Sequence, residues 1–220
     1  MSYRRTPLVI GEYYHIFNRG VARQPTFLSR FDYKYALESL VYYQTARPII
    51  SLSRFREASE EDRENYLNTI LSVPRYVDII AFVFMPNHFH MLLKQNEESG
   101  ISTFLSKFTN SYTRYFNVKH QRVGPLFQGR FKSIHVETTE QLLHVSRYIH
   151  LNPLASGVVH ENEVERYEWS SLPDYLQASS QKCVILPVLE LFSKGDYEKF
   201  VMDNASYSKE LEKIKHLTLE

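Results

Sequence analysis

Cysteine is almost absent from this sequence, since Cys183 is the only one among 220 residues. A single thiol excludes a disulfide within the chain and a metal site built on paired cysteines, and it is typical of a reducing compartment. The sequence also lacks an apolar run as long as a signal peptide or a membrane span. We therefore expect a soluble, cytoplasmic protein that has no membrane partner.

Carboxylates are absent from residues 99–136, although the whole chain contains 25 of them. Because the net charge of the chain is +1, the six cations of this window leave a charge of −5 on the rest. Tyrosines and phenylalanines lie between these cations, which is typical of a nucleic-acid track where cations meet phosphates and rings stack on bases. A solvated surface is the simpler interpretation of such a run. The six cations are Lys107, Arg114, Lys119, Arg122, Arg130 and Lys132.

The most apolar stretch of the chain, residues 77–94, reads VDIIAFVFMPNHFHMLLK. Its β-branched and aromatic residues predict two strands that are joined by a turn at Pro86 and Asn87. Side chains alternate along a strand, so His88 and His90 share one face while Phe89 points to the other. Two neighbouring imidazoles suit a divalent metal ion. Two half-exposed polar residues at a strand edge are the alternative.

The remaining periodicities predict the order strand, helix, strand, strand, helix, strand, helix. This order is typical of an α+β protein with a ferredoxin-like βαββαβ core, in which helices cover one face of an antiparallel sheet. We expect this core within a catalytic domain at residues 1–157 and an accessory helical extension at residues 158–220. Besides the central pair, the expected elements are strands at 12–21 and 129–137 and helices at 32–47, 99–120 and 141–152.

Capping residues predict where the helices of the first half begin. Asp32 can cap the first helix. A polar, helical insertion follows at about 48–76, in which Ser59 and Asp62 form a capping box for a short helix through Leu71. This insertion is expected to be peripheral.

Similar signals bound the last helix of the core. Thr138 and Gln141 form a second capping box. Pro153 is expected to end or kink the helix, because proline lacks the amide donor and crowds the preceding turn. Beyond it, a helical tail is expected at residues 186–217.

Tyr148 and Asn152 are four residues apart in this last helix, so they lie one above the other on the same face. That face differs from the apolar stripe of Leu142 and Ile149, so it can offer a phenol and a carboxamide to a neighbouring site. Asparagine supplies an oxygen that suits Mg²⁺ or Mn²⁺ and adds no negative charge beside a phosphate. From the spacing alone, an ordinary surface or core tyrosine is the simpler interpretation of Tyr148.

Four segments in a fixed order, PNHFHMLL, GPLFQGRFKS, YIHLNPLASG and WSSLPDY, carry a family resemblance. The chain closely resembles the single-tyrosine HUH transposases over about residues 13–175, specifically the REP-associated tyrosine transposases, relatives of insertion-sequence transposases that act on single-stranded DNA. HFH fits the motif of two histidines around a hydrophobic residue. YIHLN fits the helix in which an amide ligand follows the tyrosine by four residues. Many insertion-sequence relatives have Gln where this chain has Asn152, and Asn agrees with the REP-associated branch.

By this resemblance, Tyr148 is the nucleophile, and His88, His90 and Asn152 are the ligands of Mg²⁺ or Mn²⁺. The implied activity is that of a DNA transposase and nuclease, which cleaves and rejoins single-stranded, hairpin-forming DNA through a 5′-phosphotyrosine intermediate. The six cations of residues 99–136 would then hold the hairpin.

Two alternatives stay open beside this enzyme. One is a catalytically silent module that binds DNA or RNA hairpins. The other is a zinc hydrolase, which would need a third ligand or a carboxylate that the neighbourhood of HFH does not offer. Relatives include dimers that exchange the tyrosine helix as well as monomers, so a homodimer is a possible assembly.

Overall fold

The computed structural model describes residues 7–45, 50–71, 73–179, 182–193 and 196–203. At its centre lies a four-stranded sheet in the order β2-β3-β1-β4, in which all neighbouring strands are antiparallel. This is the strand order of the predicted ferredoxin-like core, and the α+β class is confirmed. The strands are β1 (Tyr13–Arg19), β2 (Val77–Met85), β3 (His88–Gln95) and β4 (Lys132–Val136).

The predicted central hairpin is present, because β2 ends at Met85 and β3 begins at His88 on either side of Pro86 and Asn87. β1 lies between β3 and β4 and therefore has strand neighbours on both sides. The last predicted strand is shorter than expected, since β4 covers only five of the residues 129–137.

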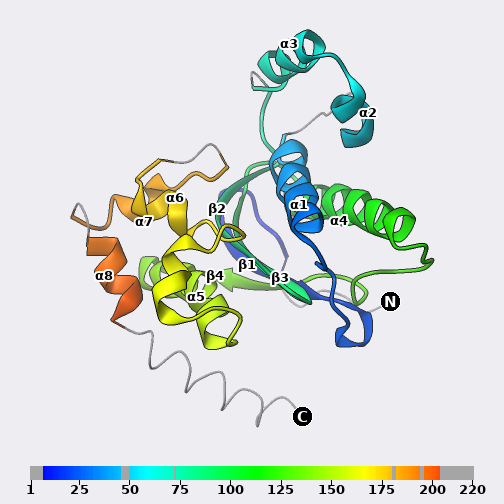
Figure 1. Cartoon of the computed structure of the whole chain (residues 1–220). Coiled ribbons are helices and arrows are strands. Elements are labelled where there is room, and N and C mark those ends of the chain that lie inside the picture. The colour runs from blue at the N-terminus through cyan, green and yellow to red at the C-terminus, as the bar shows by residue number, and fades with distance from the viewer. Residues whose placement is uncertain (1–6, 46–49, 72, 180–181, 194–195, 204–220) are drawn as a thin grey trace.

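Helices lie on both faces of the sheet (Figure 1). α4 (Gly100–Lys119) packs beside α1 (Arg30–Tyr43) on the face to which Phe89 points, and the rings of Phe89 and Phe108 meet edge to face. α5 (Thr139–Ala155) lies on the other face, where Tyr148 meets the His90 ring. The two helices inside the βαββαβ unit therefore cover one face, as predicted, and α5 covers the face that carries the histidines.

Both ends of α1 differ from the prediction. Ser29, not Asp32, is the N-cap of α1, and Asp32 is the third helical residue, whose carboxylate accepts from the Ser29 amide at 2.9 Å. The helix ends at Tyr43, with Gln44 as its C-cap, so it is shorter than the predicted helix to about residue 47. Pro153 lies inside α5, which continues to Ala155, so the proline does not end this helix.

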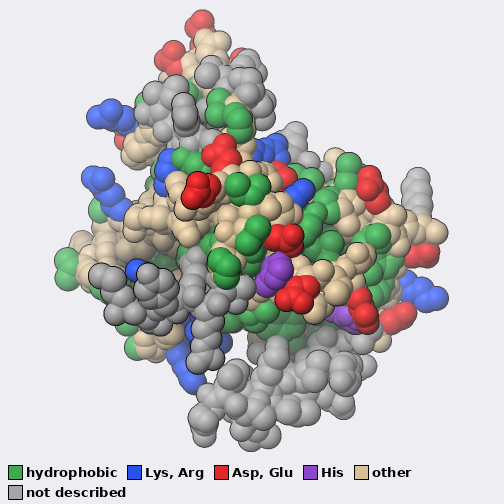
Figure 2. All heavy atoms as spheres, turned by 180° about the vertical axis from the view of Figure 1, so that it is seen from behind, with side chains coloured by type: hydrophobic (Ala, Val, Ile, Leu, Met, Phe, Trp, Pro, Cys, Tyr) green, Lys and Arg blue, Asp and Glu red, His purple; other side chains and the backbone are tan. Residues whose placement is uncertain are grey.

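The insertion consists of α2 (Leu52–Glu57) and α3 (Glu60–Leu71), which stand away from the sheet (Figure 1). The predicted cap is confirmed, because Ser59 Oγ accepts from the Asp62 amide at 3.1 Å. α3 begins with three acidic residues, Glu60, Glu61 and Asp62, and acidic and basic side chains both lie at this end of the molecule (Figure 2).

The C-terminal extension covers the outer edge of the sheet. β2 is an edge strand of the sheet. Its Phe84 amide donates to the Trp169 carbonyl at 2.8 Å, so the extension covers this edge. The described part of the predicted tail at 186–217 contains two short helices rather than one long one, and residues 204–217 lie outside the described residues. The helical elements of the extension are η2 (Glu161–Arg166), α6 (Leu172–Leu176), α7 (Leu186–Leu189) and α8 (Asp196–Met202).

Within the described ranges, none of the helices combines the length and apolarity that a membrane-spanning segment needs.

Candidate active site

The register of the sheet gathers polar side chains on the face that α5 covers. His88 is paired with Arg19 of β1, and His90 is paired with Phe17. Phe17 is in turn paired with Lys132 of β4. Because directly paired residues point to the same side of a sheet, these five side chains form one surface. The surface therefore combines two histidines of β3 with a cation from β1 and another from β4.

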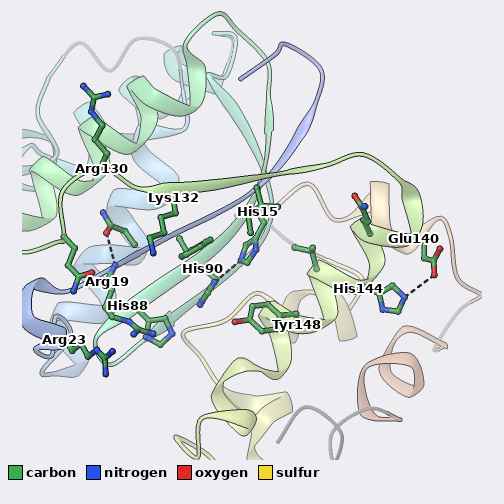
Figure 3. A pocket seen from close by; sticks show the side chains of 16 residues that line it. His15, Arg19, Arg23, His88, His90, Arg130, Lys132, Glu140, His144 and Tyr148 are labelled. Atoms are coloured by element: carbon green, nitrogen blue, oxygen red, sulfur yellow. Dashed lines mark hydrogen bonds and ion pairs between the residues drawn. The ribbon is translucent and has the colours of Figure 1, made fainter. Parts of the chain in front are cut away.

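A cleft of about 870 Å³ opens over this surface (Figure 3). His88, His90 and Tyr148 lie on its wall. Among the described residues, its charged lining is mostly basic, with Glu140 the one carboxylate. An anionic ligand is therefore favoured in this cleft. The basic side chains of the lining are Arg19, Arg23, Arg130 and Lys132.

α5 brings the phenol of Tyr148 to the histidines. The Tyr148 ring meets the His90 ring edge to face, with 5.4 Å between centroids. It also lies edge-on to His15 of β1, at 5.7 Å. The Tyr148 side chain is half-buried, and its oxygen points toward the two histidines (Figure 3). A partly accessible phenol is thus held where a ligand in the cleft can reach it.

Asn152 lies one helical turn beyond Tyr148 and is only 1% exposed. Its carboxamide is close enough to the His88 ring to raise the pKa of that ring. Burial lowers the pKa of His88 and the Arg19 charge lowers it further, while the Asn152 side chain raises it, and the result is a pKa of about 4. His88 is therefore neutral at pH 7, which is the form that binds metal ions.

Each of the two motif histidines has a hydrogen-bond partner at Nδ1. His88 Nδ1 lies 2.7 Å from Asn87 Oδ1. The Asn87 amide is itself oriented, because its nitrogen donates to the Arg23 carbonyl at 3.1 Å. His90 Nδ1 lies 2.9 Å from His15 Nε2. Such bonds to the second ring nitrogen are typical of histidines that bind metal ions.

His15 and Arg19 were missed as site residues in the sequence. Both lie in the predicted first strand, where they alternate with Phe17 on one face. The period-two pattern HxFxR was the available signal. It carries no information about the strand that pairs with it, so the distant HFH motif could not be connected to it.

The six predicted cations do not act as one group. Arg130 and Lys132 line the cleft. Lys119 instead forms an ion pair with the buried carboxylate of Asp32 at 2.6 Å. The other three do not belong to the cleft lining: Lys107 lies over the Tyr76 ring, Arg122 bonds Asn117 Oδ1 at 3.1 Å, and Arg114 is exposed on α4.

His150 is two residues from Tyr148 in the sequence, but its surroundings do not suit a general base. Its Nδ1 and Nε2 lie 2.8 Å from the hydroxyls of Tyr197 and Ser171, respectively. Its side chain is fully buried, and burial lowers its pKa to about 3. His150 therefore joins α5 to the C-terminal extension. His144, one turn before Tyr148 on α5, lines the cleft and bonds Arg147 at 2.7 Å.

The donor set in the cleft consists of two imidazoles and one amide oxygen. Among the described residues, no group of three or more His, Cys, Asp or Glu is arranged to hold a metal ion, and Asn152 adds an amide oxygen beside the two imidazoles. The neutral form of His88 and the contact between His88 and Asn152 fit a divalent cation. A zinc site of the usual three protein ligands fits less well.

Comparisons with known proteins agree with this description. Residues 47–152 match the family model for IS200-like transposases, which confirms the resemblance over these residues. The solved structure of a REP-associated tyrosine transposase bound to a REP hairpin has 17% identity and a TM-score of 0.53, covering 83% of this chain and 90% of that one. The two chains therefore share a fold.

A second solved structure, tRNA(His) guanylyltransferase from Saccharomyces cerevisiae, has 13% identity over 96% of this chain and 79% of that one. Its TM-score of 0.32 is too low to carry an argument. No curated protein matches the sequence.

Proposed function

Because the chain is similar to the IS200-like transposases over residues 47–152, we propose that it cleaves and rejoins single-stranded, hairpin-forming DNA. The observation that carries this proposal is the meeting of Tyr148 with the His90 ring at 5.4 Å, one helical turn from the contact between Asn152 and His88. A nucleophile and three metal-binding groups from distant parts of the chain thus converge in a basic cleft.

In the proposed reaction, the Tyr148 oxygen attacks the phosphorus of a phosphodiester in line with the leaving 3′ oxygen. The bond from phosphorus to the 3′ oxygen breaks, a bond from phosphorus to the phenol oxygen forms, and the phenol proton is lost while the 3′ oxygen gains one. The phosphodiester energy is kept in the 5′-phosphotyrosine, so a 3′-hydroxyl can later reverse the step and join strands.

His88, His90 and Asn152 would hold Mg²⁺ or Mn²⁺. Bound there, the cation would polarise a non-bridging oxygen of the phosphate and offset the charge that builds up in the transition state. The low pKa of His88 supports this role, because a ligand nitrogen must be unprotonated.

The DNA backbone would lie along the four cations of the cleft, Arg19, Arg23, Arg130 and Lys132. Phosphate contacts of this kind position a strand without reading its sequence. That the similar solved structure contains a REP hairpin supports a folded-back strand as the substrate. Arg130 and Lys132 keep their predicted role in this proposal, and Arg19 and Arg23 are added to them.

α5 folds back onto the sheet of its own chain and places Tyr148 beside His90, which supports cleavage by a single subunit. Residues 1–157 would be the catalytic domain, and residues 158–220 would be accessory. The bonds from His150 to Tyr197 and Ser171 support an extension that holds the tyrosine helix in place. A homodimer stays a prediction, which light scattering of the purified protein would test.

A covalent-adduct assay tests the proposal. Purified protein is incubated with Mn²⁺ and labelled hairpin oligonucleotides taken from the flanks of its gene, and the products are separated under denaturing conditions. We expect protein to become attached to the 5′ end of one product. Tyr148→Phe should abolish the adduct, whereas the control Tyr115→Phe, on α4 beside Asp32, should leave it unchanged.

Two results would change the assignment. An adduct in Tyr148→Phe as strong as in the parent would show that another residue is the nucleophile. Tight binding of hairpins with no covalent product for any of them would replace the enzyme with a silent binding module.

A further inference from the structure

We propose that His15 is a positioning residue that keeps a proton on Nδ1 of His90 and so leaves Nε2 as the nitrogen that binds the metal ion. The inference rests on the proposed function, in which His90 is a ligand. It concerns His15, which lies outside the two-histidine motif and 75 positions before His90 in the sequence.

The sheet brings the two rings together. β1 pairs with β3 so that Phe17 lies opposite His90 and His15 lies opposite Leu92. His15 is thus the diagonal neighbour of His90 on the same face, within reach of a long or aromatic side chain. The two rings are stacked at 25° with 5.1 Å between centroids. Both side chains are less than a tenth exposed, so water competes little for their bond.

The bond between the two rings determines where the proton on His90 sits. A neutral imidazole has one N–H and one lone pair, on different nitrogens. When His90 Nδ1 donates to His15 Nε2 across the 2.9 Å contact, the lone pair of His90 is on Nε2. When His15 donates instead, His90 carries its proton on Nε2 and cannot bind a metal ion there. The direction of this bond therefore decides whether His90 is a ligand.

His88 has the same arrangement with a different acceptor. Asn87 Oδ1, at 2.7 Å, can only accept, and the donation of the Asn87 amide nitrogen to the Arg23 carbonyl holds this oxygen toward the ring. His88 Nδ1 must therefore carry the proton, and its Nε2 has the lone pair. A site that uses both rings needs the same tautomer of His90, and donation to His15 supplies it.

His15 is a positioning residue rather than a third ligand. Its Nε2 is engaged with His90 Nδ1, and within the described ranges it is not part of any group of three that could hold a metal ion. The His15 ring also lies edge-on to Tyr148, so it supports the phenol and the ligand from the same side (Figure 3).

The proton on His90 can be located directly by two-bond ¹H–¹⁵N correlation spectra of the metal-free, ¹⁵N-labelled protein. We expect His90 to carry its proton on Nδ1 in the wild type and to shift toward Nε2 in His15→Phe, which keeps a ring but removes the acceptor. A wild-type His90 with its proton on Nε2 would overturn the proposal, whether or not the protein cleaves DNA.

Mn²⁺ binding, followed by electron paramagnetic resonance, gives a second readout. Loss of an outer hydrogen-bond partner typically weakens metal binding roughly 10- to 100-fold, so we expect a change of that size in His15→Phe and partial recovery in His15→Gln, whose amide oxygen can accept. The control is His135→Phe, because His135 lies on β4 opposite Tyr14 and points to the other face.

Thermal unfolding identifies a His15→Phe variant that fails to fold, and His15→Gln then decides the outcome. If folded His15→Phe binds Mn²⁺ within about twofold of the wild type and keeps the His90 tautomer, His15 has no positioning role. A wild type that binds no Mn²⁺ overturns the metal-binding part of both proposals. If the wild type and the His15 variants bind Mn²⁺ as described above but the wild type forms no DNA adduct, the assignment of His15 stands and the proposed function is wrong.

Discussion

Arg130 and Lys132 of the cleft come from the same carboxylate-free window as the cations of α4, but their surroundings differ. Lys132 lies over the Phe17 ring beside the histidines, in a cleft with a single carboxylate. Lys119 lies 2.6 Å from the buried Asp32 carboxylate and 2.9 Å from the Ser29 hydroxyl. The difference shows that one stretch of positive charge in the sequence can contain two kinds of cation. Some line a cleft where a ligand can bind, and others stabilise the fold through ion pairs.

The cleft cations should have the largest effect on DNA binding. Replacing Arg130 and Lys132 together with Gln removes two phosphate contacts, so the slope of log affinity against log salt should fall by roughly 1.4, with hairpin affinity about 20-fold lower near 0.1 M salt. Fluorescence anisotropy over a salt series measures both. An unchanged slope would mean that the strand does not follow this side of the cleft.

Lys119 should affect stability instead of binding. Lys119→Ala leaves the buried carboxylate of Asp32 without its ion-pair partner, and because Lys119 is itself about one third exposed we expect a modest loss of about 2 kcal/mol in the free energy of unfolding. Urea unfolding measures this loss. Hairpin affinity at 25 °C should stay the same, and weaker binding with unchanged stability would place Lys119 on the DNA track after all.

The pH dependence of stability should reveal the same pair. Burial raises the pKa of Asp32, but hydrogen bonds from Lys119, Ser29 and the Leu28 amide outweigh it, and the pKa lies below 3.8. A lowered carboxylate pKa gives stability that is present above the unfolded pKa and lost as the pH falls through the folded pKa. Urea unfolding between pH 2.5 and 5 should show this loss below about pH 4, and Lys119→Ala should flatten it.

Arg114 should have the smallest effect of all. It is exposed on α4 and does not line the cleft. Arg114→Gln should change hairpin affinity less than about twofold and the free energy of unfolding by less than about 0.5 kcal/mol. A change as large as that of the cleft variant would mean that the bound DNA extends across α4, which would remove the distinction between the two groups.

Local signals were sufficient for much of the fold. The hairpin at residues 77–94 and helix α4 follow from alternation and from helical periodicity, and Ser59 with Asp62 caps α3 as predicted. Helix ends were less predictable, because they depend on competition between neighbouring polar groups. Ser29 outcompetes Asp32 as the cap of α1, and α5 continues two residues past Pro153, to Ala155.

The candidate site was predictable only where the sequence itself joins its parts. Tyr148 and Asn152 share a helix face by spacing, and His88 and His90 share a strand face by alternation. His15 and Arg19 belong to the same surface, but only because β1 inserts between β3 and β4. That pairing is a long-range property of the fold, and no local pattern contains it. The role of Lys119 was hidden for the same reason, because its partner Asp32 lies on another helix.

The identity of the nucleophile is the central claim, and the covalent product tests it most directly. Tryptic digestion after incubation with Mn²⁺ and a cleaved hairpin releases residues 148–166 as one peptide, in which Tyr148 is the only tyrosine. Mass spectrometry should find the nucleotide on this peptide, attached through a phosphate to Tyr148. A nucleotide on any other peptide would contradict the account.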